Sequence, residues 1–284
     1  MTYEEIMRRK ESKTTLLLIY LFLTAFSIAT LYPIIQVFSI SLRPGDRLLS
    51  TSLSLIPEGA SFDAYRKLFT DERFLRWMLN SILVSAAVTI TGVALASMSG
   101  YIFSKYKFIG RKIGMVAVLT TQMFPATMLL LPMFIMIAKL HLINSYLGLI
   151  IVYSATALPF CIWQMKGFYD TIPDSLHEAA IIDGCSHFQA FYKVIMPLAA
   201  PALVITALFS FMSSWSEYIV AAQVLQGQDM FTLPLGLKQF QSNMTTEWGL
   251  FAAGSVVVSV PVVVLFVILS RWLVSGLTLG SVKE

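Results

Sequence analysis

The chain has 284 residues, of which 57% are hydrophobic and only 13% are charged. Because soluble globular domains carry about a quarter of their residues as charged side chains, this composition excludes an ordinary soluble enzyme or binding domain. The formal net charge of +4 fits Lys and Arg held at one face of a membrane better than it fits a nucleic-acid site.

Long apolar blocks dominate the chain. At about 1.5 Å of rise per residue, each block is long enough to cross a hydrocarbon core of about 30 Å as a helix. The blocks are uniformly apolar rather than alternating, so they predict helices and not the strands of a β-barrel. The sequence therefore predicts an all-α integral membrane protein in which residues 1–284 form a single domain with six transmembrane helices. The blocks are residues 14–41, 75–103, 113–138, 147–165, 201–224 and 249–274.

The ends of the chain are predicted to lie on the same side of the membrane, because the number of spans is even. The first block is expected to be a retained span, since it is too long for a signal peptide and no small-residue cleavage site follows it. The loop of residues 104–112 contains Lys105, Lys107, Arg111 and Lys112 and no acid. Cationic loops are typical of the cytoplasmic side, so both termini are predicted to be cytoplasmic.

Prolines interrupt several of the predicted spans. Pro125 and Pro132 both fall in the third block, seven residues apart. A proline inside a helix removes a hydrogen bond and kinks the chain, and broken helices often line the substrate path of transporters. The other interpretation is that proline is simply more frequent in membrane helices. For the third block we predict a break that faces the path.

A long polar segment, residues 166–200, separates the fourth block from the fifth. Pro173 suits the first turn of a helix, and Ser175 with Glu178 has the spacing of a capping box. Gly184 suits the left-handed position that ends a helix. A second capping box then opens another helix. The segment is thus predicted to be a helix–turn–helix, and the second capping box consists of Ser186 and Gln189.

One side of the first predicted helix carries mainly small residues, so another surface can approach it closely. An alternative is an ordinary amphipathic helix lying on the membrane surface. The residues on this side are Leu176, Ala179, Ala180 and Asp183.

The polar segment resembles the EAA loop of bacterial ATP-binding-cassette importer permeases. That loop reads Glu-Ala-Ala, three residues, Gly, nine residues and Ile-x-Leu-Pro, and this chain has Val194 and Met196 at the Ile and Leu positions. Residues 122–125, 215–218 and 276–283 resemble the carbohydrate branch of the family, and residues 232–237 and 271–278 its smaller maltose-type permease subunit. The resemblance assigns coupling to an ATPase to Glu178, Ala179, Ala180, Asp183, Gly184 and Pro197.

The resemblance also implies the rest of a transport complex in a bacterial cytoplasmic membrane. Its expected partners are a second homologous permease subunit, two ATPase subunits and an extracellular or periplasmic solute-binding protein. The chain contains no phosphate-binding P-loop, so ATP and magnesium are expected to bind the ATPase subunits. No catalytic residue and no metal site are predicted, because the three histidines lack ligand spacing.

The predicted function is import of an oligosaccharide of the maltodextrin or galacto-oligosaccharide type. The alternative is a secondary transporter driven by an ion gradient, which usually needs internal repeats and several ionisable groups inside its spans. We see no repeat, and Glu217 is the one acid clearly inside a predicted span. ATP dependence of uptake separates the two alternatives.

Three further regions are candidates for function. The substrate path is assigned to Pro125, Trp215 and Glu217, although Trp215 suits packing or an interface anchor better and Glu217 equally suits contact with outer water. In the loop between the last two spans, the polar run and the family resemblance assign a contact with the binding protein to Gly227 and Gln228, and the alternative is a plain connector. By resemblance, the C-terminal tail contacts the ATPases through Gly280, Ser281 and Lys283, although composition alone indicates a frayed end.

Overall fold

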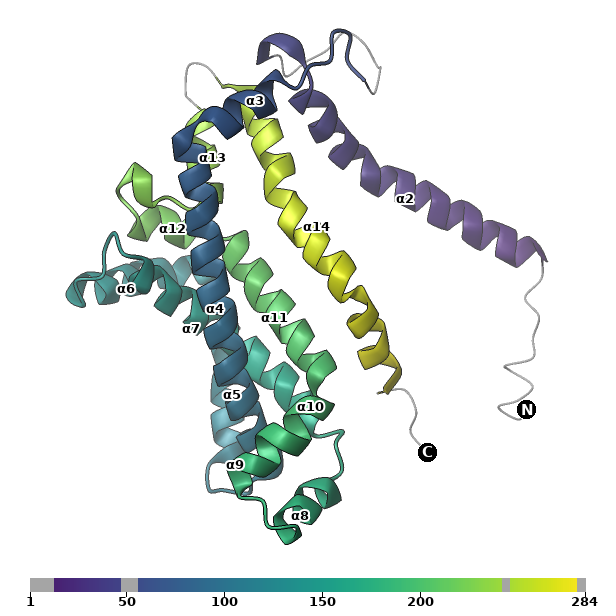
Figure 1. Ribbon diagram of the computed structural model, residues 1–284, viewed down its shortest axis with the longest axis vertical. Helices are drawn as coiled ribbons and strands as arrows, with labels where there is room; N and C mark the ends of the chain where they lie inside the picture. The colour runs from purple at the N-terminus through teal and green to yellow at the C-terminus, as the bar shows by residue number, and fades with distance from the viewer. Residues whose placement is uncertain (1–12, 47–55, 242–245, 280–284) are drawn as a thin grey trace. The chain divides into compact units, whose positions relative to one another are not determined.

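The computed structural model describes residues 13–46, 56–241 and 246–279 (Figure 1). Its regular elements within these ranges are helices, apart from one isolated bridge between Gln241 and Thr246. The α-helices are α2 (Lys13–Ser41), α3 (Asp63–Thr70), α4 (Glu72–Lys105), α5 (Arg111–Thr121), α6 (Ala126–Lys139), α7 (Tyr146–Tyr169), α8 (Asp174–Ile182), α9 (His187–Ala190), α10 (Met196–Leu198), α11 (Ala200–Trp215), α12 (Ile219–Val224), α13 (Leu233–Leu237) and α14 (Trp248–Leu279).

Four helices in the described ranges are long and apolar enough to cross a membrane: α2, α4, α7 and the part of α14 up to Ser270. A fifth candidate is a bent pair, in which His187–Leu198 and Ala200–Trp215 meet at 82°. The all-helical membrane fold predicted from the sequence is therefore confirmed. The count of six is not reached by unbroken helices, because two of the predicted blocks are divided.

The divided blocks are the third and the fifth. Residues 122–125 separate α5 from α6, and Pro125 precedes the first residue of α6, where its missing N–H costs no helical hydrogen bond. The predicted break is thus present at Pro125, whereas Pro132 lies inside α6 without ending it. In the fifth block, residues 216–218 separate α11 from α12.

The chain clusters into two compact units. Among the described residues, one contains residues 13–46, 56–68, 240–241 and 246–256, and the other contains residues 69–239 and 257–279. In the first unit, α2 exposes apolar side chains along most of its length, and only Ser39 and Ser41 near its end are buried. The Ser41 hydroxyl lies 2.7 Å from the Tyr65 hydroxyl of α3, which fixes the end of α2 within this unit.

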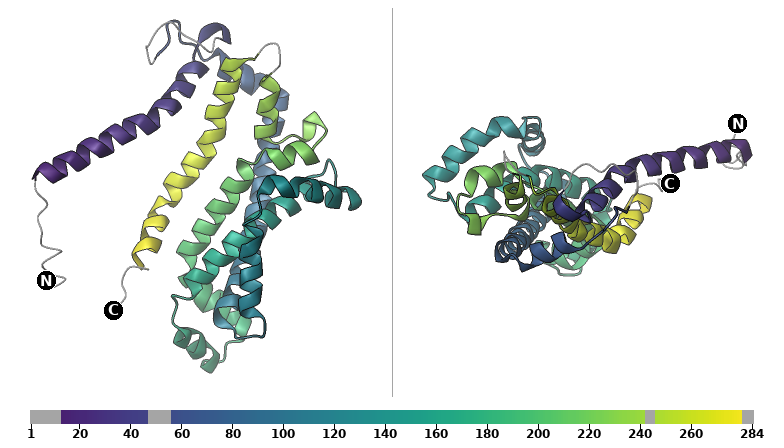
Figure 2. Two further views of the ribbon diagram at one scale, coloured as in Figure 1. Left: turned by 180° about the vertical axis from the view of Figure 1, so that it is seen from behind. Right: turned by 90° about the horizontal axis from the view of Figure 1, so that it is seen from above.

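The second unit is built on α4, α7 and α11, which pack against one another (Figures 1 and 2). Small residues on α4 allow this close packing, as is common between membrane helices. A Cβ atom added to Gly92 would lie 2.7 Å from the Ser210 hydroxyl of α11. One added to Gly100 would lie 2.8 Å from the Cβ atom of Met165 in α7. The backbones of these three helices are therefore in near contact.

Candidate functional site

The polar segment between α7 and α11 forms the predicted helix–turn–helix, but its first helix starts without the predicted capping box. Pro173 is the residue before α8, and no side chain caps this end. Ser175 and Glu178 already lie within the helix. The physical reason is that Pro173 directly precedes the first helical residue, Asp174, so Ser175 already lies inside the helix and cannot cap it.

The turn that ends α8 depends on Gly184. Its φ angle is +87°, in the left-handed region that glycine adopts without strain. The N–H of Gly184 donates to the Ile181 carbonyl and the N–H of Cys185 donates to the Ala180 carbonyl, both at 3.0 Å. This pair of bonds is the Schellman arrangement, which satisfies carbonyls at the end of a helix. The predicted left-handed glycine is confirmed.

The second helix of the segment begins with the predicted capping box. The Gln189 N–H donates to the Ser186 hydroxyl at 3.2 Å, and the Ser186 N–H donates to the Gln189 side chain at 2.9 Å. A π-helical turn, Phe191–Ile195, then continues α9 into α10. Pro197 lies exposed in α10, just before the bend that leads into α11.

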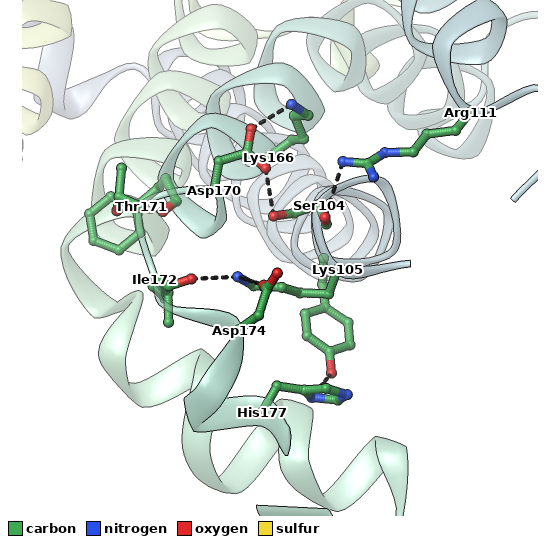
Figure 3. A network of polar contacts seen from close by, with 11 residues as sticks. Ser104, Lys105, Arg111, Lys166, Asp170, Thr171, Ile172, Asp174 and His177 are labelled. Atoms are coloured by element: carbon green, nitrogen blue, oxygen red, sulfur yellow. Dashed lines mark hydrogen bonds and ion pairs between the residues drawn. The ribbon is translucent and has the colours of Figure 1, made fainter. Parts of the chain in front are cut away.

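Lys105, the last residue of α4, anchors the start of α8 (Figure 3). Its ammonium group donates to the Ile172 carbonyl and to the Asp174 carboxylate, the latter at 2.7 Å. The Lys105 side chain is only 3% exposed, whereas that of Asp174 is 77% exposed. The hydrogen bond from Lys105 holds the pKa of the Asp174 carboxyl below its usual value. The helix start is thus fixed to α4 by a buried cation.

Aromatic and histidine rings form a second anchor. The Tyr101 hydroxyl of α4 lies 2.8 Å from Nδ1 of His177 in α8. The His177 ring stacks on the His187 ring of α9, with centroids 5.7 Å apart, and Tyr106 contacts both rings edge-on. Burial, then the neighbouring His187 and Lys105, lower the pKa of His177. These rings join the two helices of the segment to each other and to α4.

The outward surface of α8 differs in one residue from the predicted side. Leu176, Ala179 and Asp183 are exposed, as is Ile182, which is 85% exposed. Ala180 is buried, and its carbonyl accepts the Cys185 N–H in the Schellman turn. The exposed surface of α8 therefore combines Glu178 and Ala179 with the apolar Ile182, without Ala180.

The α5–α6 break lies beside α7 and borders a cavity. The Gln122 side chain donates to the Thr156 carbonyl of α7 at 2.9 Å, which fixes the end of α5. A cavity of about 400 Å³ next to the break is lined by Gln122, Phe124, Thr156 and Val220, among others, but not by Pro125. A few polar groups thus lie within a largely apolar wall.

Glu217 and Trp215 both make internal contacts. One oxygen of the Glu217 carboxylate accepts a 2.6 Å hydrogen bond from the Tyr153 hydroxyl of α7. The other oxygen accepts the Val220 N–H at 2.8 Å and so caps the start of α12. The buried Trp215 indole N–H donates to the Val258 carbonyl of α14 at 2.9 Å. Both side chains hold the α11–α12 break in place. Their partners Tyr153 and Val258 are far away in the sequence, so this role becomes visible only in the folded structure.

The loop that contains Gly227 and Gln228 is held against the first turns of α4. The Trp77 indole N–H donates to the Gln228 carbonyl at 2.8 Å, and the Asn80 side chain donates to the Asp229 carbonyl at 2.8 Å. The Gly227 N–H donates to the Asn144 side chain at 3.0 Å. The Gln228 side chain itself is exposed. The predicted tail residues Gly280, Ser281 and Lys283 lie outside the described residues.

Several of the residues that build these sites follow no local pattern in the sequence. The sequence shows Lys105 only as a cation of a loop, and nothing near Tyr101, His177 or Asn144 indicates a role. Their partners are far away in the chain: Asp174 lies 69 residues from Lys105, His177 lies 76 from Tyr101, and Gly227 lies 83 from Asn144. The one local signal was Lys105 itself, a cation at the end of a span and therefore a candidate to bind a nearby acid.

Broken membrane helices, a cavity beside one break and a polar helix–turn–helix between two spans are typical of membrane transport subunits. The chain belongs to the family described as the binding-protein-dependent transport system inner membrane component, whose model matches residues 91–278. This membership places it among importer permeases and does not favour a secondary transporter. Within the described residues, no group of three or more His, Cys, Asp or Glu side chains is arranged to hold a metal ion.

Known relatives cover nearly the whole chain. The maltodextrin transport system permease protein MdxG of Bacillus subtilis (strain 168) is 33% identical over 93% of this chain and 95% of its own length. The galactooligosaccharides transport system permease protein GanQ of the same strain is also 33% identical, over 94% and 95%. A chain in the crystal structure of a bacterial ABC transporter that imports the acidic polysaccharide alginate has a TM-score of 0.81 at 24% identity, covering 93% of this chain and 98% of that one.

Proposed function

We propose that this chain is a permease subunit of an ATP-driven importer of oligosaccharides and that α8 is its coupling helix. The observation that carries the proposal is the rigid segment from α8 through Gly184 to α9, with small and apolar side chains on its exposed surface. A helix that transmits force needs both a surface for the ATPase and a firm attachment to the spans. Lys105 and the Tyr101–His177 contact supply that attachment.

In this proposal six passes cross the bacterial cytoplasmic membrane, with both termini in the cytoplasm. The α5–α6 pair makes the third pass, and α11 with α12 makes the fifth. The whole chain is one transmembrane domain, and residues 166–200 form its cytoplasmic coupling loop. The cationic loop at residues 104–112 lies next to that coupling loop and supports the orientation, since Lys and Arg favour the cytoplasmic side.

In this proposal, the long helix α4 transmits the movement that ATP binding causes at α8, and this movement changes which side of the membrane can reach the substrate path. Its last residues hold α8 through Lys105, and its first turns hold the loop of residues 228–233 through Trp77, Asn80 and Ser81. With 34 residues, α4 spans about 50 Å at 1.5 Å per residue. A movement of α8 would therefore reach the loop proposed to face the binding protein, as alternating access by rigid elements requires.

The proposed partners supply what this chain lacks. Two ATPase subunits bind ATP and magnesium and receive Glu178, Ala179, Asp183, Gly184 and Pro197 of the coupling segment. Ala180 contributes by holding the helix from inside. A second permease subunit completes the path, and a solute-binding protein contacts Gly227 and Gln228. The tail proposal, with Gly280, Ser281 and Lys283 against the ATPases, rests on the sequence resemblance alone.

An oligosaccharide is the proposed substrate because relatives named for maltodextrin and galactooligosaccharides match over nearly their whole length. The path is proposed to pass the two breaks, with Pro125 setting the first and Trp215 and Glu217 holding the second. The cavity beside Gln122 and Thr156 supports this, since polar groups within an apolar wall suit a sugar.

The test is transport by the assembled complex in proteoliposomes, with the binding protein and a labelled maltodextrin outside and ATP inside. We expect uptake that requires ATP and that continues when ionophores collapse the ion gradients. A complex that contains no ATPase, or one that takes up sugar from an ion gradient without ATP, would contradict the proposed function. A labelled amino acid serves as the control substrate.

A further inference from the structure

A groove of about 500 Å³ lies where α4 ends and α5 begins, beside the last turns of α7. Three cations line it, Arg111 and Lys112 from α5 and Lys166 from α7. Among the described residues that line it, none is a carboxylate. The coupling contacts proposed above do not use this groove, so its charge calls for a separate explanation.

The cations are held around the groove from two elements. Gly110, at φ +89°, turns the chain so that Arg111 and Lys112 fall in the first turn of α5. Arg111 donates to the Ser104 carbonyl at 3.1 Å. Lys166 binds Asp170, whose second oxygen accepts the Ser104 hydroxyl at 2.7 Å (Figure 3). Asp170 thus offsets one of the three positive charges, and the groove keeps a net positive charge.

The rest of the groove is apolar. The Phe103 and Phe108 rings pack with centroids 5.7 Å apart and form part of its wall. Along α5, Ile113 is 77% exposed and Val116 is 55% exposed. A small soluble anion would bind the cations and leave these apolar side chains in water. An amphipathic anion, with a charged head and a hydrocarbon chain, matches both parts of the groove.

We propose that this groove binds an anionic phospholipid of the cytoplasmic leaflet, with its phosphate at Arg111, Lys112 and Lys166 and an acyl chain along Val116. Arginine forms paired hydrogen bonds with phosphate oxygens, and basic pockets between membrane helices on the cytoplasmic side suit acidic head groups. The assignment of a cytoplasmic-leaflet lipid rests on the proposed function in one respect, because the orientation proposed there places residues 104–112 at the cytoplasmic surface.

The test uses the assembled complex and a phosphatidylglycerol with a photoactivatable acyl chain. After illumination, mass spectrometry of peptides locates the attached lipid. We expect attachment within residues 103–116 and competition by phosphatidylglycerol vesicles, but not by phosphatidylcholine vesicles. Because each cation near a membrane surface is worth about a factor of five in lipid affinity, Arg111→Gln with Lys112→Gln should lower labelling about 25-fold.

Matched variants separate the lipid site from general effects of charge and folding. Lys67→Gln with Lys139→Gln removes the same charge outside the groove and should leave labelling unchanged. If the double variant at Arg111 fails to assemble, Lys112→Gln alone should lower labelling about fivefold, since the Lys112 side chain is exposed. Val116→Ser should lower labelling as well, because it removes part of the apolar wall.

Other results would overturn the proposal. Displacement of the label by inorganic phosphate would indicate a soluble-anion site. Crosslinking of Lys112 to an acidic segment of an ATPase, without lipid attachment, would indicate a protein interface. Equal labelling of wild type and the Arg111 and Lys112 variant would also contradict it. Because labelling requires no transport, its result is independent of the uptake assay that tests the oligosaccharide importer.

Discussion

At the scale of single residues, the turn after α8 offers a clean test of geometry. Nothing lies within 4 Å of a Cβ atom built on Gly184, so any cost of substitution comes from its φ angle of +87°. For a β-branched residue, the left-handed conformation costs at least about 1 to 2 kcal/mol. We expect Gly184→Val to abolish ATP-dependent uptake while the protein stays in the membrane. Asparagine tolerates this conformation, so Gly184→Asn should keep most uptake; equal uptake by the valine variant would contradict the coupling geometry.

A second residue-scale prediction concerns the buried cation of α4. Lys105→Met leaves the Ile172 carbonyl without its donor and removes the ion pair with Asp174. A lost buried hydrogen bond of this kind costs about 1 to 3 kcal/mol. The midpoint of thermal unfolding of the detergent-solubilised complex should fall accordingly. Lys107→Met, which removes a cation that acts on Asp174 through its charge, is the control for charge alone, and an equal effect of both substitutions would argue against Lys105 as the anchor.

At the scale of elements, the α8–α9 pair should respond to pH through His177. Lys105 of α4, His187 of α9 and the acids Asp174 and Glu178 of α8 all act on its charge. Folding lowers the pKa of His177, so the folded state favours the neutral ring. The free energy of unfolding is therefore highest above the ordinary histidine pKa of about 6.5, and it falls as the pH drops below that value.

The measurement is the unfolding midpoint of the complex between pH 8 and pH 5, scanned at about half-unit steps. We expect the wild type to lose stability below about pH 6.5 and His177→Gln to lose less over the same interval. His141→Asn, at a histidine in a different loop, should behave like the wild type. A His177→Gln profile identical to that of the wild type would show that His177 does not cause the loss of stability at low pH.

The loop of residues 225–241 supplies a second element-scale prediction. Its backbone is fixed to Trp77 and Asn80, while the Gln228 side chain remains exposed. A cysteine-reactive crosslinker on Gln228→Cys should therefore join this chain to the binding protein. Ser175→Cys, exposed in α8, should give no such product. Failure of Gln228→Cys in every nucleotide state would leave the loop as a connector.

The helices, the glycine turn and the second capping box were predictable because each signal lies within a few residues of the structure it sets. The left-handed Gly184 and the Ser186–Gln189 pair are of this kind. The first capping box was wrong because α8 begins at Asp174, one residue before Ser175, where Lys105, 69 residues earlier in the chain, binds the Asp174 side chain. Glu217 stayed ambiguous for the same reason: its partner Tyr153 lies 64 residues away.

At the scale of the whole molecule, the family membership matches what the sequence motif predicted, and α4 supplies what the motif could not. A motif of some twenty residues indicates a contact for an ATPase, but it says nothing of how that contact is attached to the spans. Lys105 and Tyr101 place that attachment at the end of one helix of 34 residues, whose first turns bind Gln228 through Trp77. The long-range pairs that fix it follow no local pattern, so only the folded structure reveals them.

The most direct test of the central claim is a crosslink between α8 and an ATPase subunit. In a background with Cys185→Ser, because Cys161 is already buried, Ala179→Cys provides an exposed thiol on the coupling surface. We predict that a short bifunctional reagent joins it to an ATPase subunit in the assembled complex and that ATP changes the yield. Ser216→Cys, exposed at the α11–α12 break, is the matched control and should give no such product. No product from Ala179→Cys in any nucleotide state, in a complex that still imports sugar, would contradict α8 as the coupling helix.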